Sequence, residues 1–429
     1  MENLTRRQFL IASGVTGAAA IAAGAAGLSI YELLGRAADP STAEEYRNKP
    51  KLVIVTLYGG NDGLNTLIPY ADPEYYKVRP ELAYPQERVL HLDDRLGLNP
   101  VMDGFATLWG ARQLAIVRGV GYPRPDRSHF RSMDIWQTAQ PVAPVRTGWV
   151  GRWLDGTESP VEAAVSFESV LPPLLVGETR SGACVSVDGL ALPGGISTDM
   201  VAALGAHQEG ESALRARAAT SFNDLLKIEN LVAEAQRAAG PSAAANNQVS
   251  GTGTGGASSL SAQLGLVAQC VEAGVPTSVY SVSLGGFDTH AEEIAGHEQL
   301  LTELDSALTE FVTRLARTES GQLTTVLVYS EFGRRVRANA SDGTDHGTAG
   351  PVFVLGPRVN GGFYGEQPSL TDLDDGDLKA TVDFRDVLGT ALSDVLGADP
   401  NKYLYDYTPA VLPLIRPFTD PSASASPAS

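Results

Sequence analysis

Five short runs of apolar, mostly β-branched residues, each bounded by Gly or polar residues, constrain what this chain can fold into. They cover residues 51–57, 113–117, 276–283, 323–329 and 351–355. Runs of this length and composition are typical of sheet strands that are covered on both faces. Between the third and fourth runs, apolar residues recur at spacings of three and four, which predicts an amphipathic helix that connects two strands. These residues are Leu300, Leu301, Leu304, Leu308, Phe311, Val312 and Leu315.

The alternation of strand-like runs and helical patterns continues from near residue 51 to near residue 397 without a clear break. Such alternation is typical of α/β proteins, in which helices cover both faces of a mostly parallel sheet. We therefore predict a single large α/β domain over residues 39–416, with a mostly parallel sheet and helices on both of its faces.

The N-terminal segment, residues 1–38, has the layout of a bacterial twin-arginine export signal. Arg6 and Arg7 stand just before Phe9 and Leu10, and residues 11–28 are uncharged and rich in Ala and Gly. The alternative is a transmembrane anchor, but Ala and Gly partition poorly into hydrocarbon. We expect the twin-arginine translocase as a partner and no stable membrane anchor after cleavage. The mature protein is then periplasmic or extracellular.

Two segments are too polar and too rich in small residues to bury apolar surface. Their composition predicts a flexible insertion near residues 240–259 and a disordered tail over residues 417–429. Gly251, Gly253 and Gly256 match the spacing of a dinucleotide-binding glycine loop. No strand precedes them, however, so a linker is the better interpretation.

The formal net charge of −18 excludes some classes of partner. Binding to a phosphate backbone needs clustered Lys and Arg, so nucleic acid is not expected as a partner. An acidic protein can still bind an anionic substrate through metal ions. Cys184 and Cys270 are too few for a disulfide framework, and the sequence leaves open whether they pair.

Polar residues follow the first two runs in positions that suit a ligand site. Asp62 lies in Gly-Gly-Asn-Asp-Gly directly after the first run, where open α/β sheets place their ligands. An ordinary Asp-Gly turn explains it equally well. Ser128 stands where a helical pattern begins, with His129 beside it, so it either faces an anion or caps the helix.

Three more polar clusters lie beside the last three runs, and each contains a carboxylate. Asp288 and His290 flank one residue after the third run, close enough to share one cation. We interpret His297 as a cap or surface residue. Glu331 and Arg334 follow the fourth run, and Asp345 and His346 precede the fifth. Four of the six histidines fall in or beside these clusters, a mixture that suits a two-metal hydrolytic site.

Five motifs in this order resemble one family of exported bacterial proteins: Gly-Gly-Asn-Asp-Gly, Arg-Ser-His-Phe, Gly-Gly-Phe-Asp-Thr-His, Ser-Glu-Phe-Gly-Arg and Thr-Asp-His-Gly. It is the domain-of-unknown-function family numbered fifteen hundred and one, which resembles the alkaline phosphatase and sulfatase superfamily. The resemblance implies an alkaline-phosphatase-like α/β fold.

The resemblance also implies roles for individual residues. Ser128 matches the nucleophile, and His129 is a further catalytic candidate. In the hydrolase hypothesis Arg334 or Arg127 is an oxyanion clamp that holds a non-bridging oxygen of the ester, and the alternative is an arginine that is simply solvated. The implied metal ligands are Asp62, Asp288, His290, Glu331, Asp345 and His346. Phe332 occupies the place of a metal-binding histidine. Asp345 or His129 would have to supply the missing metal ligand.

These residues lead to two hypotheses about function. The first is an exported hydrolase of phosphate or related esters that uses a Ser nucleophile and divalent zinc, manganese, magnesium or calcium ions. Its substrate would be an anionic small-molecule or polymer ester. The alternative is a non-catalytic secreted binding protein that retains a degenerate alkaline-phosphatase-like fold. The sequence lacks the Cys/Ser-x-Pro-x-Arg motif of a standard sulfatase. It also lacks the Gly-x-Ser-x-Gly elbow of a serine hydrolase of carboxylic esters.

Overall fold

A computed structural model describes residues 40–157, 161–168, 170–185 and 259–417 of the protein. The predicted export signal, nearly all of the insertion near residues 240–259 and residues 418–429 of the tail lie outside the described residues. In the described part, no helix is long and apolar enough to cross a membrane.

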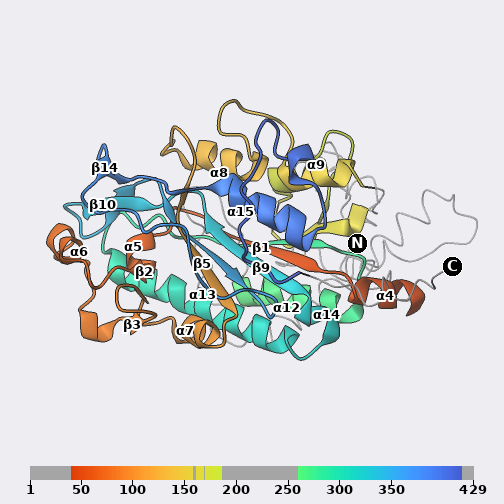
Figure 1. Cartoon of the computed structure of the whole chain (residues 1–429), viewed down its shortest axis with the longest axis horizontal. Coiled ribbons are helices and arrows are strands. Elements are labelled where there is room, and N and C mark those ends of the chain that lie inside the picture. The colour runs from red at the N-terminus through yellow and green to blue at the C-terminus, as the bar shows by residue number, and fades with distance from the viewer. Residues whose placement is uncertain (1–39, 158–160, 169, 186–258, 418–429) are drawn as a thin grey trace, which may run out of the picture.

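A nine-stranded sheet runs through the middle of the described structure (Figure 1). Its strand order is β13-β5-β12-β9-β1-β8-β6-β7, and β16 also pairs with β5. The strands are β1 (Lys51–Leu57), β5 (Leu114–Gly121), β6 (Ala164–Ser166), β7 (Ala183–Cys184), β8 (Val279–Leu284), β9 (Thr324–Ser330), β12 (Gly350–Leu355), β13 (Gly362–Tyr364) and β16 (Val382–Asp383).

The five predicted strands are confirmed as β1, β5, β8, β9 and β12. The central strands β9, β1, β8 and β6 are parallel, whereas β12 is antiparallel to both of its neighbours. The sheet is therefore mostly parallel, as predicted. All residues of β1 and β8 are buried, which explains why apolar residues occupy both faces of each strand.

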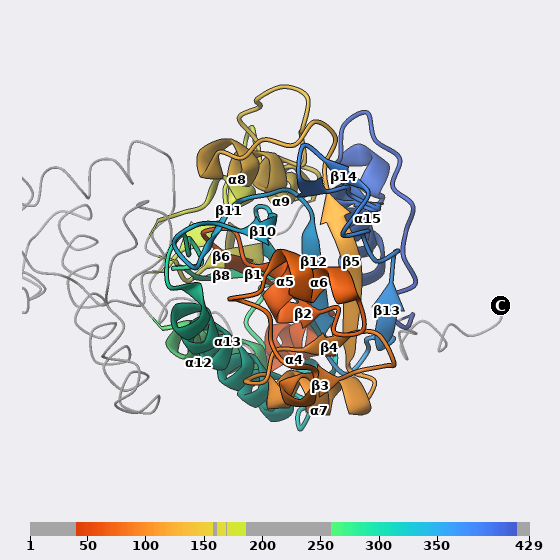
Figure 2. The same cartoon turned by 90° about the vertical axis from the view of Figure 1, so that its left-hand side faces the viewer.

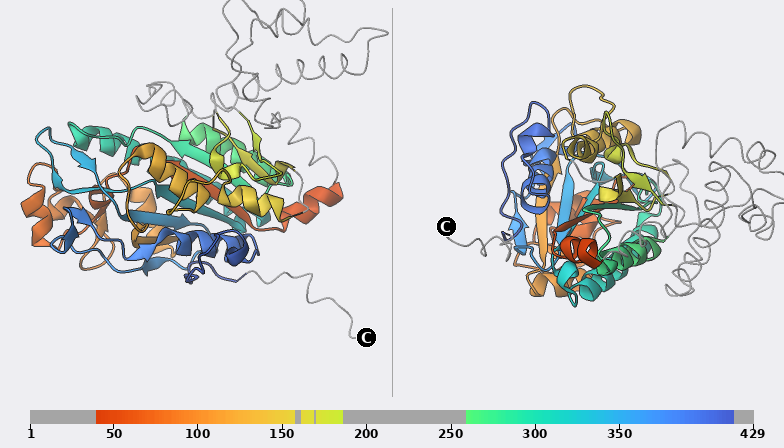
Figure 3. Two further views of the ribbon diagram at one scale, coloured as in Figure 1. Left: turned by 90° about the horizontal axis from the view of Figure 1, so that it is seen from above. Right: turned by 90° about the vertical axis from the view of Figure 1, so that its right-hand side faces the viewer.

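Helices cover both faces of this sheet (Figures 1 and 2). On one face lie α7 (Asp103–Gly110), α12 (Leu260–Ala273), α13 (Glu293–Leu315) and α14 (Glu319–Gln322). On the other lie α8 (His129–Thr138), α9 (Trp149–Asp155) and α15 (Phe384–Thr390), as the view from above shows (Figure 3). Each set packs into its own hydrophobic core against the sheet. The predicted connecting helix is confirmed as α13, which joins β8 to β9 and buries Leu301, Leu304 and Leu308.

Short elements complete the described chain. The helices are α4 (Pro40–Arg47), α5 (Gly63–Thr66) and α6 (Pro73–Val78). The strands are β2 (Leu67–Ile68), β3 (Leu90–His91), β4 (Gly97–Leu98), β10 (Arg334–Ala338), β11 (Thr344–His346), β14 (Leu373–Asp374) and β15 (Asp377–Leu378). Cys184 and Cys270 are both free thiols.

The parallel register brings the polar loops to one edge of the sheet. The last residue of β1, Leu57, lies opposite Leu284 at the end of β8 and Ser330 at the end of β9. The segments that contain Asp62, Asp288 and Glu331 therefore leave the sheet side by side.

Candidate metal centre

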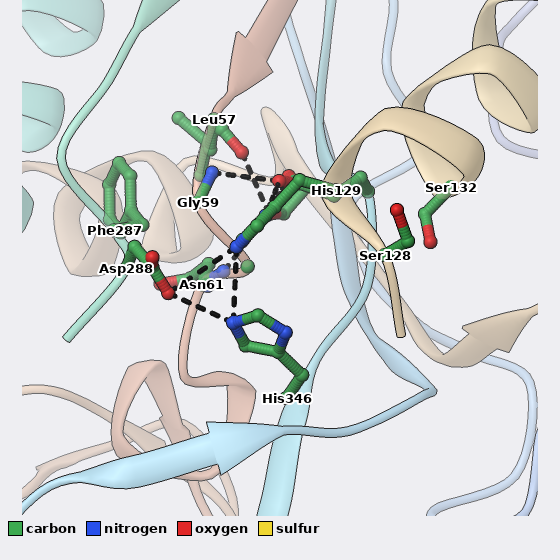
Figure 4. A network of polar contacts seen from close by, with 12 residues as sticks. Leu57, Gly59, Asn61, Ser128, His129, Ser132, Phe287, Asp288 and His346 are labelled. Atoms are coloured by element: carbon green, nitrogen blue, oxygen red, sulfur yellow. Dashed lines mark hydrogen bonds and ion pairs between the residues drawn. The ribbon is translucent and has the colours of Figure 1, made fainter. Parts of the chain in front are cut away.

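Three imidazole nitrogens and one carboxylate oxygen converge at this edge of the sheet. Figure 4 shows three of these groups, His129, Asp288 and His346. The Nε2 atom of His346 lies 3.1 Å from Nε2 of His129 and 2.9 Å from Nε2 of His290. Oδ1 of Asp288 lies 3.0 Å from Nε2 of His346, 3.0 Å from Nε2 of His290 and 3.4 Å from Nε2 of His129. The donor atoms of His129, Asp288 and His346 are close enough together to share one ion.

In two of the histidines the second ring nitrogen, Nδ1, already has a hydrogen-bond partner. Nδ1 of His346 lies 2.8 Å from the main-chain oxygen of Arg127, and Nδ1 of His129 lies 2.8 Å from Oε1 of Glu331. Both partners are acceptors, so each Nδ1 carries a proton and donates it. In the neutral rings, Nε2 then carries a lone pair that faces the cluster. Carboxylate or carbonyl partners orient metal-binding histidines in the same way.

The electrostatics of the cluster are those of a site for positive charge. Burial acts to lower the pKa of His129, but hydrogen bonds to Asp288 and Glu331 outweigh it and raise the pKa to about 9. Burial acts to raise the pKa of Asp288, whereas hydrogen bonds from His129, His346 and Arg334 hold that pKa well below its usual range. Two Nε2 lone pairs at 3.1 Å repel each other unless a proton or a cation lies between them.

The ends of the elements place these side chains. His129 is the first residue of α8, Asp288 follows β8, and His346 is the last residue of β11. Gly59, in the loop that follows β1, has a φ of +118°, and a Cβ there would come within 2.4 Å of the main-chain nitrogen of Asp288. Only glycine allows the β1 loop and the Asp288 loop to lie so close together.

Arg334 is fully buried, and its guanidinium holds the β1 loop and the Asp288 loop together. It donates hydrogen bonds to the main-chain oxygens of Gly59, Gly60, Phe287 and Thr344 and to Oδ1 of Asp288. The residue predicted as an oxyanion clamp is therefore buried, and its guanidinium is engaged by these acceptors. Arg127, the other candidate, pairs with Asp377 and Asp375.

Glu331 and Asp345 lie behind histidines of the cluster. Glu331 is buried, and its Oε1 accepts from the main-chain N–H of Gly59 as well as from His129. An oxygen of the exposed Asp345 lies 3.5 Å from Nδ1 of His290. Both carboxylates thus support ring nitrogens on the side away from the converging Nε2 atoms.

Asp62 is held in a separate buried ion pair. Its carboxylate caps α5 by accepting from Leu64 and lies 2.5 Å from the guanidinium of Arg79, and neither side chain is exposed. Burial acts to raise the pKa of Asp62, but Arg79 and Glu293 lower it to about 2. The structure therefore supplies Asp62 with a cation from its own chain. No motif in the sequence pointed to Arg79 or Glu293.

Phe332 packs against the cluster through its ring. Its centroid lies 4.9 Å from that of His129 and 5.0 Å from that of His346. An apolar ring beside the two imidazoles excludes water from that side of the site.

The interpretation of His297 as a cap or surface residue is wrong. Its side chain is buried beneath the β1 loop, and Nε2 lies 2.9 Å from Oδ1 of Asn61. The reason is that α13 begins at Glu293, four residues earlier, so that His297 falls on the buried face of the helix.

Ser128 is the N-cap residue of α8, but its side chain makes no capping hydrogen bond. In Figure 4 it lies beside Ser132, on the other flank of the helix from the imidazole of His129. The structure therefore brings His129, Asp288, His290 and His346 together and leaves Ser128 and Asp62 apart from them.

A profile of the protein family described as "Protein of unknown function (DUF1501)" matches residues 116–414. The chain belongs to the DUF1501 family. No curated protein matches this DUF1501 chain in sequence.

Solved structures with a similar arrangement include several hydrolases. A phosphonate monoester hydrolase from Silicibacter pomeroyi matches at 9% identity and a TM-score of 0.36, covering 84% of this chain and 78% of its own. Alkaline phosphatase from the Antarctic bacterium TAB5 matches at 12% identity and a TM-score of 0.31, with coverages of 74% and 94%. The lipoteichoic acid synthase LtaP from Listeria monocytogenes matches at 8% identity and a TM-score of 0.33, with coverages of 83% and 78%.

Proposed function

We propose that this DUF1501 protein is an exported metal-dependent hydrolase of phosphate or related esters. The observation that carries the proposal is the convergence of three Nε2 atoms and Oδ1 of Asp288, with two of the rings held in the tautomer that a metal requires. The order of the sequence motifs supports the ester substrate, and the N-terminal segment supports export.

One divalent ion would be held by His129, Asp288 and His346, with His290 as the fourth and most exposed donor. Three imidazoles and a carboxylate suit zinc best among the expected metals. Such an ion would polarise the ester and stabilise negative charge on its oxygens.

The start of α8 supports an anionic substrate. The side chain of Ser128 makes no capping hydrogen bond, and the Asp126 carboxylate accepts from the N–H of Ser128, so the N–H groups that follow in the first turn are available beside the ligand His129. A helix N-terminus favours negative charge through these groups and through the helix dipole. An oxyanion bound at the metal would gain from both features.

The charges around Asp62 favour a single metal ion over the expected pair of ions. Arg79 already neutralises Asp62, and both side chains are fully buried. A second cation at Asp62 would have to displace a guanidinium that also donates to the main-chain oxygens of Val336 and Arg335. We therefore propose one ion per chain.

The attacking group is better explained by water than by Ser128. In Figure 4 the Ser128 side chain lies on the other flank of α8 from the imidazole of His129, whereas a water molecule bound to the ion would already be at the site. Ser128 remains the rival nucleophile.

A second candidate function is a binding protein with a structural cation. Sites with four protein ligands are usually closed, and His290 would supply the fourth ligand. Its side chain is 44% exposed, against 12% for His129, so His290 is the donor that a substrate would displace in a catalytic site.

Zinc-loaded and manganese-loaded protein, screened against aryl phosphate monoesters, phosphate diesters and sulfate esters, tests the proposal. The matched control is Asp288→Asn, which keeps the shape of the side chain and removes its charge. Turnover of an ester by the wild type, together with loss of that turnover in Asp288→Asn, supports the hydrolase. Stoichiometric metal binding without turnover of any ester supports the binding protein.

A further inference from the structure

Asp377 is a buried carboxylate outside the metal cluster. It lies on β15, and its side chain is 1% exposed. Its Oδ2 accepts two hydrogen bonds from the guanidinium of Arg127, one from Nε at 2.9 Å and one from Nη2. Burying an unpaired carboxylate is costly, so a charged partner of this kind is needed to hold it. The side chain of Arg127 is therefore tied to the β14–β15 hairpin.

The main chain of Arg127 contacts the cluster. Its main-chain oxygen accepts the Nδ1–H of His346 at 2.8 Å, while Nε2 of His346 lies 3.0 Å from Oδ1 of Asp288. The direction of this oxygen depends on the backbone of the loop between β5 and α8. Arg127 thus joins a buried carboxylate, through its side chain, to a predicted metal ligand, through its main chain.

The same hairpin is also bound to the segment that follows His346. The hydroxyl of Thr348 donates to the main-chain oxygen of Leu378 at 2.6 Å, and Leu378 directly follows Asp377. β15 packs against β10, which pairs with β11, and β14 and β10 lie at the same end of the molecule (Figure 1). Bonded and hydrogen-bonded contacts therefore close a ring through His346, Thr348, Leu378, Asp377 and Arg127. A closed ring limits how far the Arg127 oxygen can turn away from the imidazole.

The loop before α8 has a second anchor that does not depend on Asp377. The main-chain oxygen of Asp126 accepts from the hydroxyls of Tyr122 and Ser132, at 2.9 and 2.7 Å. The carboxylate of Asp126 accepts from the N–H of Ser128. Removal of the Asp377 carboxylate should therefore leave the loop folded and loosen mainly the residue between these anchors, Arg127.

Asp375 contacts the same guanidinium but differs from Asp377 in its burial. Its Oδ2 lies 3.2 Å from Nη2 of Arg127, and its side chain is 81% exposed. An exposed ion pair contributes little, because water and salt screen it. Asp375 is therefore the matched control for Asp377.

We propose that Asp377 is a positioning residue of the metal centre, which acts through Arg127 to fix the main-chain oxygen that orients His346. The inference rests on the proposed function, because His346 is a ligand of the ion proposed there. Removal of a group that orients a metal-binding imidazole typically lowers metal affinity by about 10- to 100-fold. Asp377 acts one residue further away, so its effect should lie near the lower end of this range.

Two measurements on Asp377→Ala test the inference. Zinc affinity, measured by competition with a chelator, should fall about tenfold. In NMR spectra of the metal-free chain, the Nδ1–H signal of His346, assigned by its absence in His346→Ala, should be lost to exchange with water. Asp375→Ala should leave both readouts unchanged. A carboxylate that served only to stabilise the hairpin would lower the free energy of unfolding and leave the Nδ1–H signal in place.

A double-mutant cycle tests whether Asp377 acts through Arg127. Arg127→Ala keeps the main-chain oxygen and removes the side chain that Asp377 holds, so zinc affinity should fall to the same degree. The double variant should then bind zinc no more weakly than either single variant. Arg127→Ala should fold even if Asp377→Ala does not, because the Arg127 side chain is 39% exposed and Nε of Arg335 stays 3.7 Å from Oδ1 of Asp377.

The outcomes separate this inference from the proposed function. Unchanged zinc affinity in Asp377→Ala, an Nδ1–H signal that persists there, or losses that add in the double variant would each overturn the role of Asp377 and leave the proposed function standing. A wild type that binds no zinc would overturn the metal centre and this role with it.

Discussion

His346 donates its Nδ1–H to the main-chain oxygen of Arg127 across 2.8 Å, and this contact turns Nε2 of His346 toward Oδ1 of Asp288. Arg127 belongs to the loop before α8, and His346 ends β11, so the contact also ties two distant parts of the chain together at the site. A backbone oxygen cannot donate a proton, so the tautomer is determined by the fold.

Glu331→Gln tests the support that His129 receives. The substitution keeps the size of the side chain and removes the charge that orients the ring, so zinc affinity should fall by about 10- to 100-fold. Competition with a chelator measures this affinity. Glu319→Gln, at the start of α14 and away from the cluster, is the matched control and should leave zinc affinity unchanged. Unchanged zinc affinity in Glu331→Gln would show that Glu331 does not support zinc binding.

Arg79→Met tests the buried ion pair with Asp62. Removal of one partner leaves an uncompensated buried charge, which should lower the free energy of unfolding by about 3–5 kcal/mol. Urea denaturation measures the change. The double variant Arg79→Met with Asp62→Asn should recover part of the loss, because it removes the stranded carboxylate. A single variant as stable as the wild type would show that the pair is not needed to compensate Asp62.

The pH dependence of stability tests the burial of His297. Burial lowers the pKa of His297 to about 4, below the ordinary value of 6.5, so the unfolded chain binds the proton more tightly. The stabilising contribution of the neutral ring is therefore complete above about pH 6.5 and is lost as the pH falls toward 4. Between pH 6.5 and 5 the loss amounts to about 1.6 kcal/mol. Metal-free His297→Gln should show a pH dependence weaker by that amount in urea denaturation, and a dependence equal to the wild type would contradict the burial.

Ser128→Ala tests the identity of the attacking group. Because the Ser128 side chain lies on the other flank of α8 from the imidazole of His129, the variant should keep turnover of an aryl phosphate close to the wild-type rate. Steady-state kinetics on zinc-loaded protein, with metal content measured in parallel, gives the comparison. A loss of about 1,000-fold or more with normal metal content would identify Ser128 as the nucleophile instead.

Several features followed directly from local sequence. The run over residues 51–57 coincides with β1, because a strand buried on both faces leaves a continuous apolar run. The proximity of Asp288, His290 and His346 also followed, since polar segments at the ends of neighbouring strands leave the sheet at one edge.

Other features depend on contacts between distant segments, which local patterns do not contain. Arg79 lies 17 residues after Asp62 and reaches it because its guanidinium also binds two main-chain oxygens of β10. The burial of His297 depends on where α13 begins, and an irregular loop decides that position. The antiparallel direction of β12 follows from the β10–β11 hairpin that precedes it, and an apolar run looks the same in either direction.

Metal stoichiometry tests the central claim most directly. Purified chain is incubated with zinc, manganese, magnesium or calcium in turn, dialysed and analysed for bound metal per chain. The control is His91→Ala, which removes a histidine that stacks on Tyr70 away from the cluster. We predict one zinc ion per chain in the wild type and in this control, and nearly none in the double variant Asp288→Ala with His346→Ala. A wild type that retains none of the four metals, or a double variant that retains as much zinc as the wild type, would contradict the metal centre.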